Sequence, residues 1–233
     1  MELTLEEWKR EMARPGVRCI LQVRHAERPK MDPKDPTFGD TLALTPEGCR
    51  TARELGRLLA EFRDDVTFVS SPLRRTRMTA ELIAEGMGLG AVQIPAFGCL
   101  GNESFYYNDV AKVLEVFTPP ENFFPACIGY YRTGRLSGFN ELHEASDNLE
   151  RWLVERHERK LLVATTHDCY IAAFLSARGA IAEFSRANWP RFLDAGAIFI
   201  YPDGARRYAM VRTGLSTGIV GVKPEQSKQG EKS

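Results

Sequence analysis

A histidine flanked by arginines is the part of this sequence with the clearest chemistry. Arg24, His25 and Arg28 lie within five positions, directly after the mostly apolar run 19–23. Such a run is typical of a buried strand, so the three side chains are expected at one edge of a sheet. A neutral imidazole is a nucleophile near neutral pH, and guanidinium groups match phosphate oxygens in pairs. The pattern indicates a nucleophile beside a phosphate clamp, although a basic surface cluster after a strand has the same residues.

Two further apolar runs, 66–69 and 161–165, are predicted to be strands that end where helices begin. Polar side chains follow these two runs: Ser71, Arg75, His167 and Asp168. Thr45 and Ser71 are each expected to be the N-cap of the helix that follows. Because sites in α/β sheets form at strand ends where helices begin, we expect these side chains to lie near His25.

Taken together, these positions resemble the motifs of the histidine phosphatase superfamily, whose fold is also called phosphoglycerate-mutase-like. Four motifs match in the family's order: Arg24-His25-x-x-Arg28, Leu44-Thr45-Pro46-x-Gly48, Ser71-Pro72-Leu73-x-Arg75-x-x-x-Thr79-Ala80 and His167-Asp168. The resemblance implies an α/β fold, a three-layer α/β/α sandwich with a mostly parallel central sheet and an inserted cap segment. The alternation of predicted strands and helices agrees with this fold. Ala26 stands where most members have glycine, and we expect this small residue to be tolerated.

The resemblance also implies a role for each residue of these motifs. His25 would be the nucleophile that carries a transient phosphoryl group, and His167 would complete the pocket. The phosphate oxygens would be held by three arginines: Arg24, Arg28 and Arg75. Fixed guanidinium groups suit the charge of a transferring phosphoryl group, so neither a metal nor another cofactor is expected. The sequence also has no clustered carboxylates or His/Cys pairs at metal-ligand spacing.

Two carboxylates are candidates for the general acid that protonates the leaving alkoxide. Asp168 matches the His-Asp pair of the acid-phosphatase and phytase branch, in which the aspartate is the donor. Glu103 lies 28 residues after Arg75, near the spacing at which the mutase branch places its donor glutamate. Asp168 is also typical of the first turn of a helix, and Glu103 of an ordinary loop. We expect Asp168 to be the donor, with Glu103 as the alternative.

The segment 97–139 is predicted to determine the substrate. It holds ten of the 23 aromatic residues of the chain, and the resemblance implies that it covers the site as a cap insertion. Its basic residues are only Lys112, Arg132 and Arg135, which are few for a polyphosphorylated substrate. The segment therefore predicts a small-molecule phosphate monoester of a partly apolar or ring-bearing alcohol. The alternative is that the aromatic side chains only pack the segment onto the rest of the domain.

Composition predicts a single domain over residues 1–233 with a polar, disordered tail at 223–233. The formal net charge is zero, which gives no electrostatic reason to expect nucleic acid or an anionic membrane as a partner. Five scattered cysteines favour free thiols in a reducing cytoplasm. Residues 1–15 have neither the pattern of a signal peptide nor that of a membrane span, so a cytoplasmic location is expected. The sequence predicts no particular oligomeric state.

We therefore predict an enzyme, a metal-independent phosphomonoesterase that works through phosphohistidine at His25. A phosphoglycerate-type mutase would use the same residues, but it would need more basic residues for a second anionic group. A phosphoprotein phosphatase is a further alternative, although a long cap is unusual for one. A catalytically silent binding module on the same fold is the last alternative, and the retained histidines and arginines argue against it.

Overall fold

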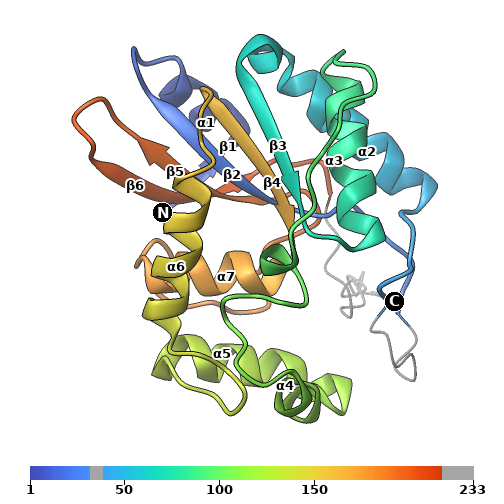
Figure 1. The fold of residues 1–233 in the computed structure, drawn as a ribbon, viewed down its shortest axis with the longest axis vertical. Helices are drawn as coiled ribbons and strands as arrows, with labels where there is room; N and C mark the ends of the chain where they lie inside the picture. Colours follow the sequence, from blue (N-terminus) through green and yellow to red (C-terminus); the bar gives the residue numbers. More distant parts are fainter. Residues whose placement is uncertain (32–38, 217–233) are drawn as a thin grey trace, which may run out of the picture.

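A six-stranded sheet forms the centre of the computed structural model, which describes residues 1–31 and 39–216. In the described chain the strands are β1 (Glu2–Thr4), β2 (Arg18–Arg24), β3 (Val66–Ser70), β4 (Leu161–Thr166), β5 (Ala195–Ile200) and β6 (Arg206–Arg212). The strand order is β1-β6-β5-β2-β4-β3 (Figure 1). β2, β4 and β3 are parallel neighbours, β1 is parallel to β6, and β5 is antiparallel to both β2 and β6. The predicted mostly parallel α/β sheet is confirmed.

Helices cover both faces of this sheet. In the described chain the helices are α1 (Leu5–Met12), α2 (Pro46–Leu58), α3 (Arg74–Gly86), α4 (Val110–Phe117), α5 (Phe123–Thr133), α6 (Leu142–Val154) and α7 (Asp168–Ala177). Successive strand residues point to opposite faces, so Leu21 joins a core with α1, α2 and α3, whereas Ile20 joins a second core with α5, α6 and α7. The two cores on either side of the sheet give the three-layer sandwich.

Of the two predicted N-cap residues, Thr45 caps a helix and Ser71 does not. Thr45 is the N-cap of α2, and its side-chain oxygen accepts a hydrogen bond from the Gly48 amide at 2.9 Å. The prediction for Ser71 is wrong, because α3 begins at Arg74 and its N-cap is Leu73. The Ser71 side chain is buried and lies 3.3 Å from a ring nitrogen of His167, so it faces the neighbouring strand end instead.

The segment 97–139 contains α4 and α5, and these two helices lie farther from the sheet than α7 (Figure 1). Its side chains pack with α6 and α7 in the second core, to which it contributes Cys127 and Tyr130. That the segment covers a bound substrate stays a prediction, as does the division into a single domain. The predicted tail at 223–233 lies outside the described residues.

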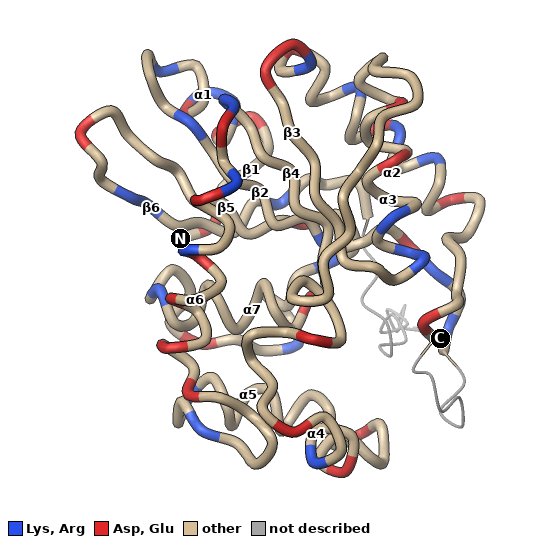
Figure 2. Tube along the Cα trace, viewed as in Figure 1, with Lys and Arg blue, Asp and Glu red and all other residues tan. Residues whose placement is uncertain are grey.

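Three further observations bear on the sequence predictions. All five cysteines are free thiols, as predicted. Within residues 1–31 and 39–216, no helix has the length and apolar character needed to cross a membrane. Figure 2 shows acidic and basic positions intermixed along the described chain, as the zero net charge would suggest.

Candidate active site

The carboxyl ends of β2, β3 and β4 bring the two predicted site histidines together. Arg24 at the end of β2 is in register with Thr166 at the end of β4, so the residues that follow, His25 and His167, leave the sheet side by side. The His25 amide donates to the Thr166 carbonyl at 3.0 Å. The centroids of the two imidazole rings are 5.5 Å apart. His25 and His167 therefore lie close together, as the sequence predicts.

The geometry of His25 leaves one ring nitrogen ready to act as a nucleophile. Its Nδ1 lies 2.8 Å from the Ala26 carbonyl oxygen, and a carbonyl can only accept, so Nδ1 carries the proton. The lone pair is then on Nε2. Burial, together with the charge of Arg24, holds the pKa of the His25 imidazole well below its usual range. His25 is consequently neutral at neutral pH, the form in which imidazole is nucleophilic.

Ala26 fits the site without strain. Among the described non-glycine residues only Leu193 has a positive φ, so Ala26 needs none of the freedom that glycine would give it. Ala26 is fully buried, and its amide donates to the Thr79 hydroxyl of α3 at 3.0 Å. The departure from glycine in the first motif therefore leaves the site intact.

Arg24 is held rigidly beside His25. The side chain is 2% exposed, and one Nη donates to the Pro190 carbonyl at 2.6 Å while the other lies 3.0 Å from Asp168 Oδ2. Its guanidinium stands 4.3 Å from the centroid of the Phe192 ring, a cation–π contact. A guanidinium fixed in this way is preorganised for an anion and needs little reorganisation when one binds.

Arg75 and Arg28 add positive charge to the same place. Arg75 lies in the first turn of α3, is buried, and donates to the Gly39 carbonyl at 2.8 Å. Burial and the charge of Arg28 together lower the pKa of Arg75 to about 10, so Arg75 remains charged at neutral pH. Burial and these arginines also hold the pKa of His167 well below its usual range. The adjacent Arg74 is exposed.

The two candidate general acids lie in different surroundings. Asp168, the first residue of α7, accepts through Oδ2 from Arg24 and from Trp189 Nε1 at 2.9 Å, and through Oδ1 from the Cys169 amide at 3.0 Å. Glu103 is exposed, and its carboxylate lies against Gly98. Within the described chain, Glu103 has no hydrogen bond or ion pair with the histidines or arginines. The structure thus brings Asp168 into the cluster and places Glu103 outside it.

Comparison with known proteins identifies the family of the chain. A family model, the histidine phosphatase superfamily (branch 1), matches residues 20–195. The chain belongs to the histidine phosphatase superfamily. A search of curated protein sequences finds no match.

Several solved structures share the fold of this chain. YhfR of Bacillus stearothermophilus has a TM-score of 0.57 at 16% identity, over 85% of this chain and 99% of that one. The phosphoglycerate mutase of Bacillus anthracis has a TM-score of 0.52 at 12% identity, over 82% and 91% of the two chains. The Rv3214 protein of Mycobacterium tuberculosis has a TM-score of 0.52 at 17% identity, over 82% and 95%. At these identities the likeness shows the fold alone.

Sequence reasoning missed the loop 188–194, which packs beside the histidine phosphatase motifs. The Phe192 ring lies 5.6 Å from the His25 ring, and the Asp194 carbonyl accepts from the Arg24 amide at 2.9 Å. Trp189 reaches Asp168, as described above. The local sequence Asn188-Trp189-Pro190 predicts a loop, but it does not indicate which residues the indole contacts.

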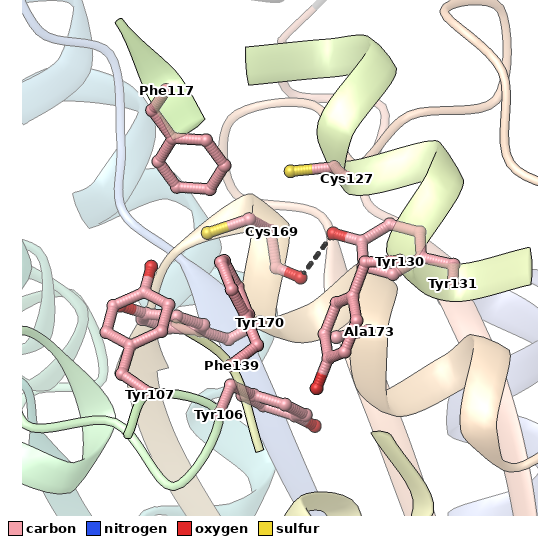
Figure 3. A pocket seen from close by; sticks show the side chains of 10 residues that line it. All are labelled: Tyr106, Tyr107, Phe117, Cys127, Tyr130, Tyr131, Phe139, Cys169, Tyr170 and Ala173. Carbon is pink, nitrogen blue, oxygen red and sulfur yellow. Dashed lines mark hydrogen bonds between the residues drawn. The ribbon is translucent and has the colours of Figure 1, made fainter. Parts of the chain in front are cut away.

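An aromatic hollow lies against α7 (Figure 3). Its cavity volume is only about 10 Å³, room for about one water molecule, because the lining side chains pack closely. These are Tyr106, Tyr107, Phe117, Cys127, Tyr130, Tyr131, Phe139, Cys169, Tyr170 and Ala173. Tyr170 forms the wall toward the histidines, since its ring centroid is 5.7 Å from that of His167. Six of the ten aromatic residues of segment 97–139 line this hollow and also contact one another in the second core. Packing therefore accounts for much of their burial.

The free energy of unfolding is expected to fall as the pH is lowered below about 6.5. The pKa values of His25 and His167 are depressed in the folded protein by burial, whereas histidines in the unfolded chain titrate near 6.5. Below that pH the unfolded chain takes up protons that the folded protein does not. Each of the two histidines then costs up to about 1.4 kcal/mol of stability per pH unit, and the effect vanishes above about pH 7.5.

Urea unfolding at pH 7.5, 6.5 and 5.5 in a phosphate-free buffer measures this dependence. His167→Gln is expected to reduce the slope of the free energy of unfolding against pH by the contribution of one histidine. His143→Gln is the control, since it changes an exposed ring and leaves the slope unchanged. His157 is buried beyond the end of α6, and burial lowers its pKa to about 4, so it adds to the pH dependence of stability. A stability that stays constant from pH 7.5 to 5.5 would contradict the assignment of neutral buried histidines.

Proposed function

We propose that the protein is a metal-independent phosphomonoesterase that acts through a phosphohistidine at His25. The observation that carries the proposal is the free Nε2 lone pair of a neutral His25 beside the charges of Arg24 and Arg75. In the first step Nε2 attacks phosphorus, the bond from phosphorus to the ester oxygen breaks, and the alkoxide leaves with a proton from Asp168. In the second step Asp168 takes a proton from water, which attacks the phosphohistidine and releases phosphate. The arginines hold the phosphate oxygens throughout.

Binding of the substrate supports the role of Asp168. In the free protein the carboxylate is paired with Arg24. A phosphate that binds Arg24 competes for that guanidinium and brings negative charge close to Asp168. The carboxyl group is then released from its ion pair and can carry the proton that a leaving alkoxide takes up.

The charges of segment 97–139 favour hydrolysis over a phosphoglycerate-type mutase reaction. A mutase substrate carries a second anionic group that needs its own cations. Lys112 is paired with Asp109 at 3.3 Å, and Arg132 with Glu183 at 2.8 Å. Figure 2 shows few other basic positions around α4 and α5. With two of its three cations already paired, the segment offers little to a second anion.

The proposal is tested by phosphate release from a panel of monoesters at pH 4 to 8 with EDTA present. We expect turnover with EDTA, and an acid-labile, base-stable phosphoryl group on His25 in protein quenched during turnover and mapped by mass spectrometry. A strict requirement for a divalent metal, or turnover with no phosphorylated histidine, would overturn the proposal. Isomerisation of a phosphoglycerate without release of phosphate would indicate the mutase.

A ring on the alcohol is expected to improve the substrate, because aromatic side chains of segment 97–139 pack against Tyr170 (Figure 3), whose ring lies beside that of His167. Benzyl and ethyl phosphate are a suitable pair, since their alcohols are leaving groups of similar strength. Partial burial of the phenyl ring is expected to raise kcat/KM for benzyl phosphate at least about 10-fold over ethyl phosphate, or roughly 1.4 kcal/mol.

Steady-state kinetics of two alanine variants check this preference. Phe117→Ala, which removes a lining ring, is expected to reduce the preference for benzyl over ethyl phosphate to less than about 3-fold. Phe97→Ala is the matched control, because that ring packs on Trp152 at 5.0 Å and does not line the hollow. Equal kcat/KM for the two esters in the wild-type protein would show that the aromatic residues serve packing alone.

A further inference from the structure

The indole of Trp189 donates a hydrogen bond to the carboxylate of Asp168. Trp189 is 2% exposed, and its Nε1 donates to Asp168 Oδ2 at 2.9 Å. The same oxygen accepts from Arg24 at 3.0 Å, and Oδ1 accepts from the Cys169 amide. Trp189 and Arg24 are thus the two side chains that orient the Asp168 carboxyl group in the described structure.

These two side chains differ in what happens to them when a phosphate binds. Arg24 is part of the phosphate clamp, so an anion in the site competes with Asp168 for its guanidinium. Trp189 carries no charge, and its N–H has no reason to leave Asp168 for the phosphate. With substrate bound, the indole is therefore the side chain that keeps the carboxyl group in place.

The indole is itself fixed by its surroundings. It stacks on the Tyr131 ring of α5, with centroids 6.1 Å apart and planes 18° from parallel. Three further rings contact it: Phe123, Phe124 and Phe184. The Trp189 carbonyl accepts from Arg212 at 3.1 Å. A ring held on its face, its edge and its main chain cannot rotate freely away from Asp168.

The same contacts connect Asp168 to the inserted segment. The Tyr131 hydroxyl donates to the Cys169 carbonyl at 2.7 Å, one residue after Asp168 in the first turn of α7 (Figure 3). Helix α5 therefore reaches Asp168 by two routes, through the indole and through the main chain of α7.

We propose that Trp189 is a positioning residue that orients Asp168 for proton transfer to the leaving alkoxide, an inference that rests on the proposed phosphomonoesterase reaction. Its N–H holds Oδ2 in the place from which a proton reaches the ester oxygen.

The charged and titratable groups around Asp168 come from several elements. Arg24 and Arg28 belong to β2 and the loop after it, Arg75 belongs to α3, and their charges act on or respond to Asp168. The other titratable groups that feel the carboxylate are Cys127, Tyr131 and Cys169. Burial raises the pKa of each of these three groups, so they stay neutral across pH 4 to 8. They therefore place no further charge beside the carboxylate.

The test compares Trp189→Phe with Trp152→Phe on two esters. Trp152 packs on Phe97 and Arg156, away from the site, and serves as the matched control. Ethyl phosphate needs a proton on its leaving oxygen, whereas para-nitrophenyl phosphate does not. For Trp189→Phe we expect kcat on ethyl phosphate to fall about 10- to 100-fold and kcat on para-nitrophenyl phosphate to fall less than about 3-fold.

Other outcomes separate the failure of this inference from the failure of the proposed function. An equal fall on both esters, or no fall on either, would show that Trp189 is structural or idle. Asp168→Asn is the reference: if it is selective for ethyl phosphate while Trp189→Phe is not, only the positioning role fails. If Asp168→Asn lowers kcat equally on both esters, Asp168 is not the general acid and the proposed mechanism itself is wrong. Should Trp189→Phe not fold by circular dichroism, benzothienylalanine at position 189 keeps the ring shape, removes the N–H and answers the same question.

Discussion

Replacing His25 by alanine is expected to lower kcat by at least about 10⁴-fold, with no activity restored by metal ions. The imidazole is neutral, its Nδ1 proton is held by the Ala26 carbonyl, and Nε2 carries the lone pair that attacks phosphorus. Alanine removes that lone pair and leaves the arginines in place. The variant should therefore still bind phosphate but transfer none.

Two measurements together identify the cause of the loss. Hydrolysis of para-nitrophenyl phosphate with EDTA gives kcat for the wild-type protein and for His25→Ala. Binding of inorganic phosphate, measured by calorimetry, shows that the clamp of the variant is intact. His143→Ala, which changes an exposed histidine on α6, is the control and should keep full activity. Equal turnover by His25→Ala and the wild-type protein would place the nucleophile elsewhere.

The sequence predicted those parts of the site that follow directly from strand ends. The apolar runs before His25 and His167 became β2 and β4, and the parallel register of these strands placed the two rings 5.5 Å apart. The arginines could be predicted for the same reason, because Arg24 ends β2 and Arg75 lies in the first turn of α3. Where a side chain is positioned by its own strand or helix, the local sequence pattern is sufficient to predict its place in the site.

The parts that the sequence did not predict depend on contacts between distant segments. Ser71 was expected to cap a helix, but its burial beside His167 depends on how β3 and β4 pair. Trp189 is 21 residues from Asp168, and only the packing of its loop against α5 and α7 brings its indole to that carboxylate. No residue spacing encodes such a contact, because it is set by the shape of the surrounding core.

The assignment of the general acid is expected to be decided by Asp168→Asn and Glu103→Gln. Asparagine keeps the size of the side chain and can still accept from Arg24 and Trp189, but it has no acidic proton to give. On ethyl phosphate we expect Asp168→Asn to lower kcat about 10²- to 10⁴-fold, the usual contribution of general acid catalysis. On para-nitrophenyl phosphate the fall should be less than about 10-fold, because that leaving group departs without a proton.

Glu103→Gln is the matched carboxylate-to-amide change outside the cluster, and kcat should stay within about 2-fold of the wild-type value on both esters. Its exposed carboxylate lies against Gly98, and in the described chain it has no hydrogen bond or ion pair with the site histidines. A selective loss on ethyl phosphate in Glu103→Gln, with Asp168→Asn unaffected, would reverse the assignment. It would also require loop 98–104 to move Glu103 toward His25 when substrate binds, so a change in protection of that loop on phosphate binding, measured by hydrogen exchange, would have to accompany it.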